Sequence, residues 1–219
     1  MGNVLRLPPA LYSPDAVDEW GRDAQLIDLL TPLAKLRWDV SVGGTHHLPR
    51  RDGALLVTNS RRWSLSAIYA AWALSRAIDR PVRFGGRPDF APVGPLLQRL
   101  GGLLNHPDEI RSALGAGELV VVSCHGTADP RHAGPVQAAL IGTAVVTASP
   151  VFPVASMSSL IGRAARVEVG PQVRPTHKRR GPLAELELAD TVQRHLQRML
   201  DGFGGLRTGV APVDWLAEG

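Results

Sequence analysis

The sequence has little cysteine, little lysine and no long apolar run, and each shortage excludes a class of protein. Cys124 is the only cysteine among the 219 residues, so no disulfide can form within the chain. A lone thiol is typical of a reducing compartment. The longest apolar run, roughly residues 139–155, is interrupted by glycine and proline and falls short of the ~20 apolar residues that a membrane-spanning helix needs. We therefore expect neither a disulfide scaffold nor a membrane-spanning protein.

Lysine is almost absent, and the formal net charge of +4 is carried by arginine. A basic surface attracts anionic partners such as lipid headgroups, phosphates or nucleic acid. The chain has no zinc-ligand spacing, no recognition helix and no aromatic RNA-binding motif, so we expect no metal and no nucleic-acid partner. The basic stretch that starts at Thr176 reads equally well as a contact to an anionic membrane surface and as a solubilising loop.

The first residues lack the apolar core and the small-residue cleavage site of a signal peptide, because Arg6 is followed closely by Pro8 and Pro9. We expect a cytoplasmic protein, with peripheral attachment to the inner face of the membrane as the alternative. Hydrophobic residues make up 44% and charged residues 20% of the chain, both ordinary for a single globular domain. We divide it into an N-terminal helical segment (1–35), an α/β domain (36–203) and an irregular tail (204–219).

A helix is predicted over residues 14–37, capped by Ser13. Five apolar residues recur there at helical spacing, namely Leu26, Ile27, Leu30, Leu33 and Leu36. This stripe fits a helix packed on the domain better than one lying in a membrane interface between Trp20 and Trp38. Both interpretations are kept.

Short apolar runs alternate with helical patterns along the rest of the chain. Strands are predicted at 37–44, 54–59, 81–86, 101–105, 118–123, 149–156 and 165–173, and helices at 64–78, 93–100, 108–114 and 182–200. Such alternation implies crossover connections and a mostly parallel central sheet flanked by helices, the α/β class. Ligands of these sheets bind outside the carboxyl ends of the strands, so the loops after Asn59 and Ser123 are the places to look for a site.

The order of these segments resembles the phospholipid/glycerol acyltransferase superfamily, of the 1-acylglycerol-3-phosphate acyltransferase type. The similarity runs over about residues 36–200 and rests on "ALLVTNSRRWS", "PVRFGGRPDFAPVGPLLQRLGGLL", "GELVVVSCHGTAD" and "VFPVAS". The resemblance implies acyl transfer from a thioester, acyl-CoA or an acyl carrier, to a glycerolipid hydroxyl. In the family, a His oriented by an Asp five positions later removes the proton from that hydroxyl.

The family's catalytic positions carry other residues here. The His falls on Ser60 and the Asp on Leu65, so the His-x4-Asp motif is degenerate. The Phe-Pro-Glu-Gly-Thr block reads Ser-Cys-His-Gly-Thr, which puts His125 in place of the Glu, and its following Arg is Ala128. The block that should end in a phosphate-binding Arg ends in Asn105 and His106 instead.

Two readings of this site follow. In the favoured one, the chain is a pseudoenzyme that binds acyl or glycerolipid ligands, or a partner acyltransferase, in an apolar groove beside the former active edge. In the other, it is an active acyltransferase or a hydrolase in which Ser60 and His125 are catalytic. In both readings Arg61, Arg62, Gly126 and Thr127 are the substrate-binding candidates.

Several other residues have side chains that could carry chemistry. Arg83 and Arg87 could line the same edge and hold an anion, or be solvated. His47 and Asp52 have the family's spacing but precede the buried strand, so we interpret them as a surface turn. Cys124 is interpreted as a small buried residue rather than a nucleophile.

Overall fold

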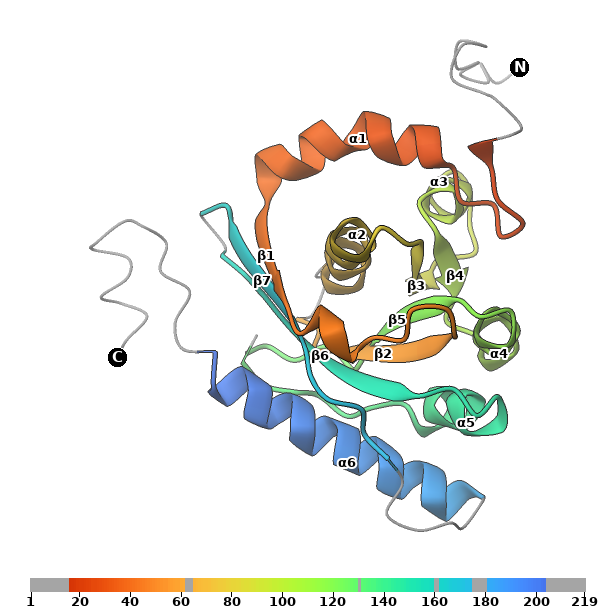
Figure 1. Ribbon diagram of the computed structural model, residues 1–219, viewed down its shortest axis with the longest axis vertical. Coiled ribbons are helices and arrows are strands. Elements are labelled where there is room, and N and C mark those ends of the chain that lie inside the picture. The colour runs from red at the N-terminus through yellow and green to blue at the C-terminus, as the bar shows by residue number, and fades with distance from the viewer. Residues whose placement is uncertain (1–15, 62–64, 130, 160–161, 175–180, 204–219) are drawn as a thin grey trace.

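The computed structural model describes residues 16–61, 65–129, 131–159, 162–174 and 181–203. These residues build one sheet with helices on both faces (Figure 1). The seven strands are β1 (Asp39–Gly43), β2 (Ala54–Thr58), β3 (Val82–Arg87), β4 (Gly102–Leu104), β5 (Leu119–Ser123), β6 (Val151–Ser158) and β7 (Ala164–Val169). The six α-helices are α1 (Ala24–Arg37), α2 (Ser66–Ile78), α3 (Val93–Arg99), α4 (Pro107–Gly115), α5 (Ala138–Val146) and α6 (Pro182–Asp201).

The strands are arranged in the order β1-β7-β6-β2-β5-β3-β4, and every neighbouring pair is parallel except β6 and β7. This confirms the mostly parallel α/β sheet. Because β7 runs antiparallel to β6 and β1 is parallel to β7, these two strands run opposite to the other five, and both begin beside the end of β6, where Ala165 of β7 lies opposite Ser158 of β6.

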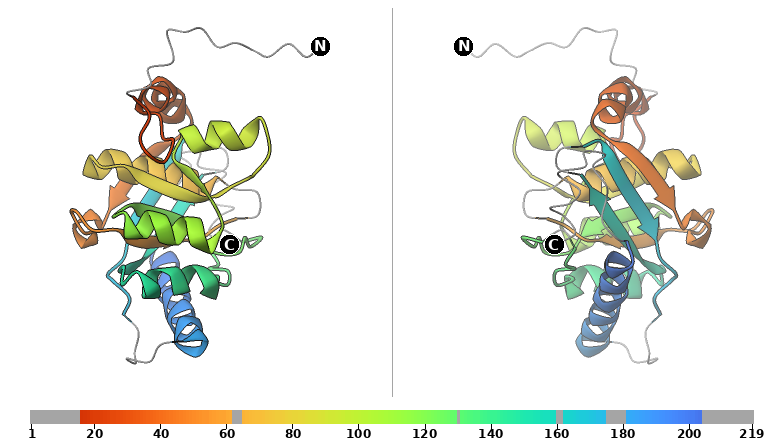
Figure 2. Two further views of the ribbon diagram at one scale, coloured as in Figure 1. Left: turned by 90° about the vertical axis from the view of Figure 1, so that its right-hand side faces the viewer. Right: turned by 90° about the vertical axis from the view of Figure 1, so that its left-hand side faces the viewer.

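The core has two layers because successive residues of each buried strand face opposite sides of the sheet. In β2, Ala54 and Leu56 pack beneath α2, whereas Leu55 and Val57 pack against α4, α5 and α6. All five residues of this strand are buried, as expected for a central parallel strand covered on both faces. The side views show α1 and α6 at opposite ends of the layered molecule (Figure 2).

Helix α1 is shorter than the sequence predicts. Asp23 caps it, since its carboxylate accepts a hydrogen bond from the Leu26 amide at 3.0 Å. Before it, Asp18 accepts hydrogen bonds from the amides of Trp20 and Arg22. The prediction of a helix was therefore wrong for residues 16–23, because a side-chain carboxylate that satisfies nearby amides favours a turn over a helix. The predicted cap Ser13 lies outside the described residues.

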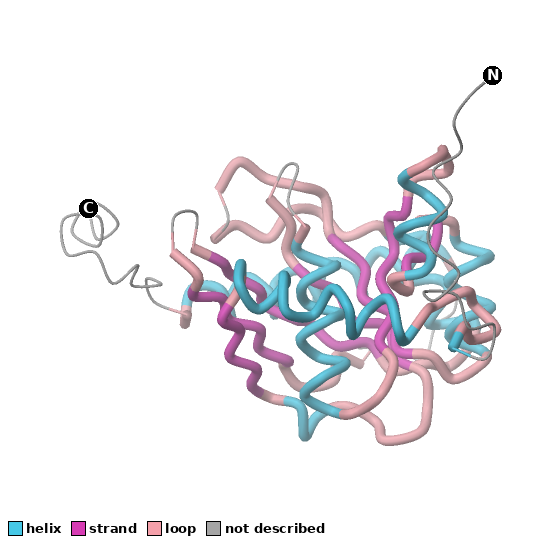
Figure 3. Tube along the Cα trace, turned by 90° about the horizontal axis from the view of Figure 1, so that it is seen from above, coloured by secondary structure: helices cyan, strands magenta, loops and turns pink. Residues whose placement is uncertain are grey.

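The apolar stripe of α1 is only partly covered. Leu33 and Leu36 are 62% and 68% exposed, and Thr31 is the one buried residue of the helix. Seen from the side that carries α1, helices cross in front of the strands at the centre of the view and leave other strands uncovered (Figure 3). Helix α1 arches across α2 and is held at its two ends: Asp23 pairs with Arg99 of α3, and the chain continues from Trp38 directly into β1.

One helix was not predicted at all. Helix α5 lies in the run that the sequence analysis treated only as an interrupted apolar stretch, and it packs between α4, α6 and the sheet. The remaining elements lie within a few residues of their predicted positions.

Candidate functional site

The candidate site lies where β2 and β5 end side by side. Thr58 pairs with Ser123, and the backbone contact continues past the strands, with the Cys124 amide donating to the Thr58 carbonyl at 2.9 Å. The Thr127 amide then donates to the Ser60 carbonyl at 3.0 Å. The parallel sheet thus brings the segment of Ser60 and Arg61 alongside that of His125, Gly126 and Thr127, five of the six site candidates.

The sixth candidate, Arg62, lies outside the described residues. Arg61 forms an isolated parallel bridge with Thr127, so its backbone position follows from the pairing of the two loops. Leu65, which the sequence resemblance aligns with the family's Asp, occupies the N-cap position of α2 and is 54% exposed. An apolar side chain can neither orient an imidazole nor cap the helix, and α2 has no side-chain cap bond at this end.

Ser60 and His125 do not form a nucleophile–base pair in this conformation. The Ser60 hydroxyl donates to the Arg61 carbonyl at 3.2 Å. The His125 ring is exposed and makes no hydrogen bond or ion pair within the described residues. Asp129, the nearest acid in sequence, accepts a hydrogen bond from the Arg131 amide at 2.8 Å instead. Activation of a serine needs a base in hydrogen-bond reach and a third group to orient that base, and the part of the chain that the structure describes shows neither contact for Ser60 and His125.

The loop after His125 is held by its own contacts. The Thr127 hydroxyl donates to the carbonyls of Asp129 and His132, at 2.6 and 3.1 Å. A Cβ on Gly134 would lie 2.0 Å from the His125 carbonyl oxygen, so only glycine allows the returning chain to pass this close. These bonds use the hydroxyl of Thr127 inside the loop, while its amide is used by the bond to Ser60.

Beneath this edge lies a buried polar network that the sequence analysis missed. The Asn59 amide group donates to the Ser156 carbonyl and accepts from the Ser156 amide, both at 2.8 Å, although Asn59 is only 2% exposed. Thr58 and Ser156 share a hydrogen bond between hydroxyls at 2.8 Å. A sequence signal existed: polar residues directly follow a fully apolar strand in "LLVTNS". The network ties the end of β2 to β6.

Tyr69 of α2 completes the network from above. Its hydroxyl interacts with Ser66, Ser156 and Ser158, and burial raises the pKa of Tyr69 to about 12 against these hydrogen bonds, which lower it. Its ring lies 5.6 Å from the Trp38 ring, between centroids. Tyr69 therefore contacts both the polar network of Asn59 and Ser156, through its hydroxyl, and Trp38 at the end of α1, through its ring.

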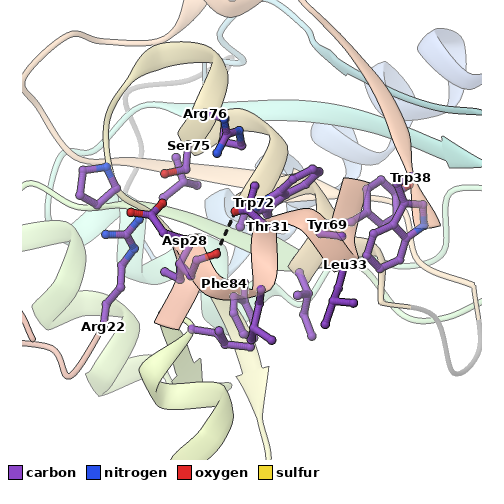
Figure 4. Close-up of a pocket in the computed structure, with 18 of the residues that line it drawn as sticks. Arg22, Asp28, Thr31, Leu33, Trp38, Tyr69, Trp72, Ser75, Arg76 and Phe84 are labelled. Carbon is purple, nitrogen blue, oxygen red and sulfur yellow. Dashed lines mark hydrogen bonds between the residues drawn. The ribbon is translucent and has the colours of Figure 1, made fainter. Parts of the chain in front are cut away.

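That space is a cavity of about 610 Å³ between α1 and α2 (Figure 4), within the range of small-molecule sites. Its walls are mostly apolar and aromatic, with Ile27, Leu30, Leu33, Trp38, Ile68, Tyr69, Trp72 and Phe84 among the lining residues. A hydrogen bond from the Trp72 indole N–H to the Thr31 hydroxyl, at 3.3 Å, joins the middle of α1 to α2. The sequence predicts an apolar groove beside the candidate edge, but none of the five described candidate site residues is among the residues that line this cavity.

The cavity extends from one edge of the sheet to the other. At the carboxyl edge it is bounded by Arg37, Trp38 and Tyr69. At the amino edge it ends among charged side chains that include Arg22 and Arg76. Tyr69, at the first end, also interacts with Ser156, whose amide donates to Asn59, the residue before Ser60.

Two arginines have different positions from those considered in the sequence analysis. Arg83 does not line the carboxyl edge: it is 1% exposed and pairs with Asp18 at 2.8 Å and Glu118 at 3.0 Å. That interpretation was wrong, because Arg83 stands near the start of β3 and faces the N-terminal turn. Arg87 does stand at the end of β3, where its guanidinium lies 3.6 Å from Glu109.

The remaining candidates are structural. His47 and Asp52 lie in the connection before β2, as expected for a surface turn. Cys124 is 4% exposed and packs against α6, and burial raises the pKa of its thiol. Among the described residues, no cluster of His, Cys, Asp and Glu could hold a metal ion. None of the helices in this part of the chain combines the length and the apolarity needed to cross a bilayer.

Comparison with known proteins supports the fold. No protein-family model and no curated protein sequence matches the chain. Among solved structures, the chain is similar to the 1-acyl-sn-glycerophosphate (LPA) acyltransferase PlsC from Thermotoga maritima, with a TM-score of 0.63 and 18% sequence identity. The match covers 84% of this chain and 81% of that one. It confirms the acyltransferase-like α/β fold that the sequence resemblance implied.

Proposed function

From this acyltransferase fold, we propose that the chain binds an acyl chain or glycerolipid-like ligand in the cavity between α1 and α2 and does not catalyse acyl transfer. The observation that carries the proposal is the combination of a large apolar cavity with a degenerate catalytic edge. The ligand class comes from the fold and from the chemistry of the cavity walls.

The catalytic edge supports the non-catalytic part. Proton removal from a hydroxyl needs a base, and a base such as His must be oriented by a partner. Ser60 occupies the position of the base and Leu65 that of the orienting acid. His125 stands where the family has Glu, and its ring has no partner in the described part of the chain. Three parts of the family's machinery are thus replaced together.

The cavity supports the binding part. Its walls can bury a flexible hydrocarbon chain, at about 0.8 kcal/mol for each methylene removed from water. The aromatic rings of Trp38, Tyr69 and Trp72 give flat, stiff walls whose entropy cost on binding is small. A thioester such as acyl-CoA or an acyl carrier is the natural source of such a chain, and an intact acyltransferase is the natural partner protein.

We also propose a peripheral position on the inner, cytoplasmic face of the membrane. Large apolar side chains are exposed on α1 and around α3, namely Leu29, Leu33, Leu36, Phe90, Val93 and Leu96. Combined with a net charge of +4, these side chains would favour an anionic lipid surface. The same surface would give a lipid ligand a short route into the cavity.

The alternative is an enzyme that uses Ser60 and His125. The backbone bond between Thr127 and Ser60 favours it, because it places the two candidates on adjoining segments. A change of side-chain conformation would be needed before the hydroxyl meets the imidazole, because the hydroxyl donates to the Arg61 carbonyl instead.

The test begins with purified full-length protein, from which bound lipid is extracted and identified by mass spectrometry. Turnover of acyl-CoA is then measured with lysolipid acceptors. We expect co-purified acyl lipid and no turnover above a protein-free control. Turnover that is abolished in Ser60→Ala and His125→Ala, but kept in the exposed loop variant His132→Ala, would establish the enzyme reading instead.

A second pair of variants tests the cavity itself. Ala34 lines the cavity, and Ala34→Trp should fill it and remove most of the bound lipid. Gln25 is exposed on the same helix and does not line the cavity, so Gln25→Trp should retain the lipid. Equal lipid content in the two variants would show that the ligand lies elsewhere.

A further inference from the structure

Helix α1 is attached at its two ends and spans the cavity between them. At the N-terminal end, the buried Asp23 carboxylate pairs with Arg99, and the Asp23 amide donates to the Arg99 carbonyl at 2.8 Å. At the C-terminal end, the Arg37 guanidinium donates to the carbonyls of Ser159 and Gly162, at 3.4 and 3.3 Å. Between these attachments the helix lies over the cavity, whose lining includes Ile27, Leu30, Thr31, Leu33 and Ala34.

Little packing holds the middle of α1 in place. No apolar side chain of the helix belongs to the buried apolar clusters that the described residues form, or packs against them. Leu29, Leu33 and Leu36 are all more than half exposed. An isolated helix of about 12–15 residues is marginal in water, and burial of one face supplies most of the stability of a helix in a protein. Because α1 has 14 residues and buries only Thr31, it has little of this stabilisation.

Pro32 weakens the helix at the same place. A proline inside a helix has no N–H to donate to the carbonyl four residues earlier, here that of Asp28, and its ring crowds that carbonyl. The neighbouring Thr31 hydroxyl donates to the Ile27 carbonyl at 2.8 Å and accepts from the Trp72 indole N–H at 3.3 Å (Figure 4). The weakest turn of α1 is therefore joined to α2 by a hydrogen bond longer than the usual range.

We propose that residues 27–33 of α1 form a strap that opens over the cavity and closes on its occupant. Opening breaks the bond between Thr31 and Trp72 and unwinds the helix near Pro32, while the two anchored ends stay in place. A hydrocarbon chain in the cavity gives the closed strap the apolar contacts that it otherwise lacks, so binding shifts the strap toward the closed state. This rests on the proposed acyl-binding function and adds how the ligand enters and is retained.

Hydrogen–deuterium exchange of the purified full-length protein, read by mass spectrometry, tests the opening without any ligand. Backbone amides exchange through local opening, and segments with few buried apolar contacts open most often. We expect the amides of residues 28–37 to exchange at least about 100-fold faster than those of α2, whose apolar face is buried in the core. Equal protection of the two helices would overturn the strap.

Two variants change the strap in opposite directions. Thr31→Val keeps the shape of the side chain and removes its hydroxyl, so α1 should exchange about tenfold faster. Pro32→Ala restores the missing N–H and adds a good helix former, so α1 should exchange about tenfold slower. Thr191→Val is the matched control on α6, because the Thr191 hydroxyl also donates to the carbonyl four residues earlier, that of Glu187. It should leave the exchange of α1 unchanged. If Thr31→Val folds poorly, Pro32→Ala decides: α1 exchange as fast as in wild type would count against the strap.

Ligand entry is measured with cis-parinaric acid, a fatty acid that fluoresces in apolar surroundings. At a free concentration of about ten times its Kd, the probe should slow the exchange of α1 about tenfold. It should leave β2, which is already covered on both faces, unchanged. Pro32→Ala should slow both association and dissociation of the probe about tenfold, because a more stable closed strap opens less often.

The outcomes separate the two proposals. If the probe binds and α1 exchanges at the same rate with and without it, the acyl-binding function stands and the strap is overturned. If the probe does not bind, the proposed function fails and the closing step fails with it, while the exchange of the free protein still decides whether α1 opens.

Discussion

Replacement of Tyr69 by phenylalanine tests the buried polar layer that separates the cavity from the candidate site. Tyr69 is 4% exposed, and its hydroxyl interacts with Ser66, Ser156 and Ser158. Tyr69→Phe keeps the ring that packs on Trp38 and removes one hydroxyl, while Ser156 keeps its bonds to Asn59. Near neutral pH, we expect a loss of about 1 kcal/mol in the free energy of unfolding, the usual net contribution of a hydrogen bond.

The pH dependence gives a sharper result. The folded pKa of Tyr69 is raised to about 12, whereas the unfolded value is about 10. The stabilisation is therefore fully present below pH 10 and is lost as the pH rises toward 12. Two units of pKa correspond to about 3 kcal/mol. Tyr69→Phe lacks this titration, so the variant should become the more stable protein by about 1 kcal/mol near pH 12, where the unfolded tyrosine is fully ionised and the folded one about half.

Urea unfolding, followed by tryptophan fluorescence at a series of pH values from 8 to 12, measures the pH at which wild type and Tyr69→Phe have equal free energies of unfolding. The chain has only two tyrosines, so phenolate absorbance of the folded protein provides an independent measure of the delayed titration. If wild type and Tyr69→Phe lose stability in parallel over this range, the Tyr69 hydroxyl is solvated and the buried layer does not exist as described.

Two further predictions concern the ion pairs and the thiol. Arg83→Ala leaves the carboxylates of Asp18 and Glu118 without their buried partner and should lower the free energy of unfolding in urea by about 3–5 kcal/mol. Arg111→Ala removes an exposed pair with Asp108 and should lower it by less than about 1 kcal/mol. Equal losses in the two variants would show that the Arg83 pairs are not buried as described. The Cys124 thiol, buried and with a raised pKa, should react with a disulfide reagent far more slowly in the folded protein than in urea, and comparable rates would contradict its burial.

The parallel sheet and the meeting of Ser60 with the His125 loop could be predicted, because both follow from strand order. Strands that are apolar up to their last residue, such as β2 and β5, are recognisable as central strands, and parallel strands end at the same edge. The polar layer below was harder to foresee. Asn59 and Ser156 are far apart in sequence, and only the pairing of β2 with β6 brings them together.

The failures of prediction also have physical causes. Helix α5 is apolar on nearly every side because it is packed between other elements, so it lacks the periodicity by which a surface helix is recognised. The start of α1 was misplaced because the Asp18 carboxylate binds nearby amides, a preference that apolar spacing does not record. Arg83 was misread because the acid that covers it, Asp18, precedes it by 65 residues.

The reversed strand β7 decides which end of the cavity is near the candidate site. β7 turns back from the end of β6, and β1 pairs with β7 in parallel, so β1 also starts beside the end of β6. The C-terminal end of α1, which leads into β1, therefore lies at this carboxyl edge of the sheet. Had β7 continued the parallel pattern, the helix would have met the sheet from the other side. The orientation of α1 relative to the sheet is thus set by the reversal of chain direction between β6 and β7, more than a hundred residues later in the sequence.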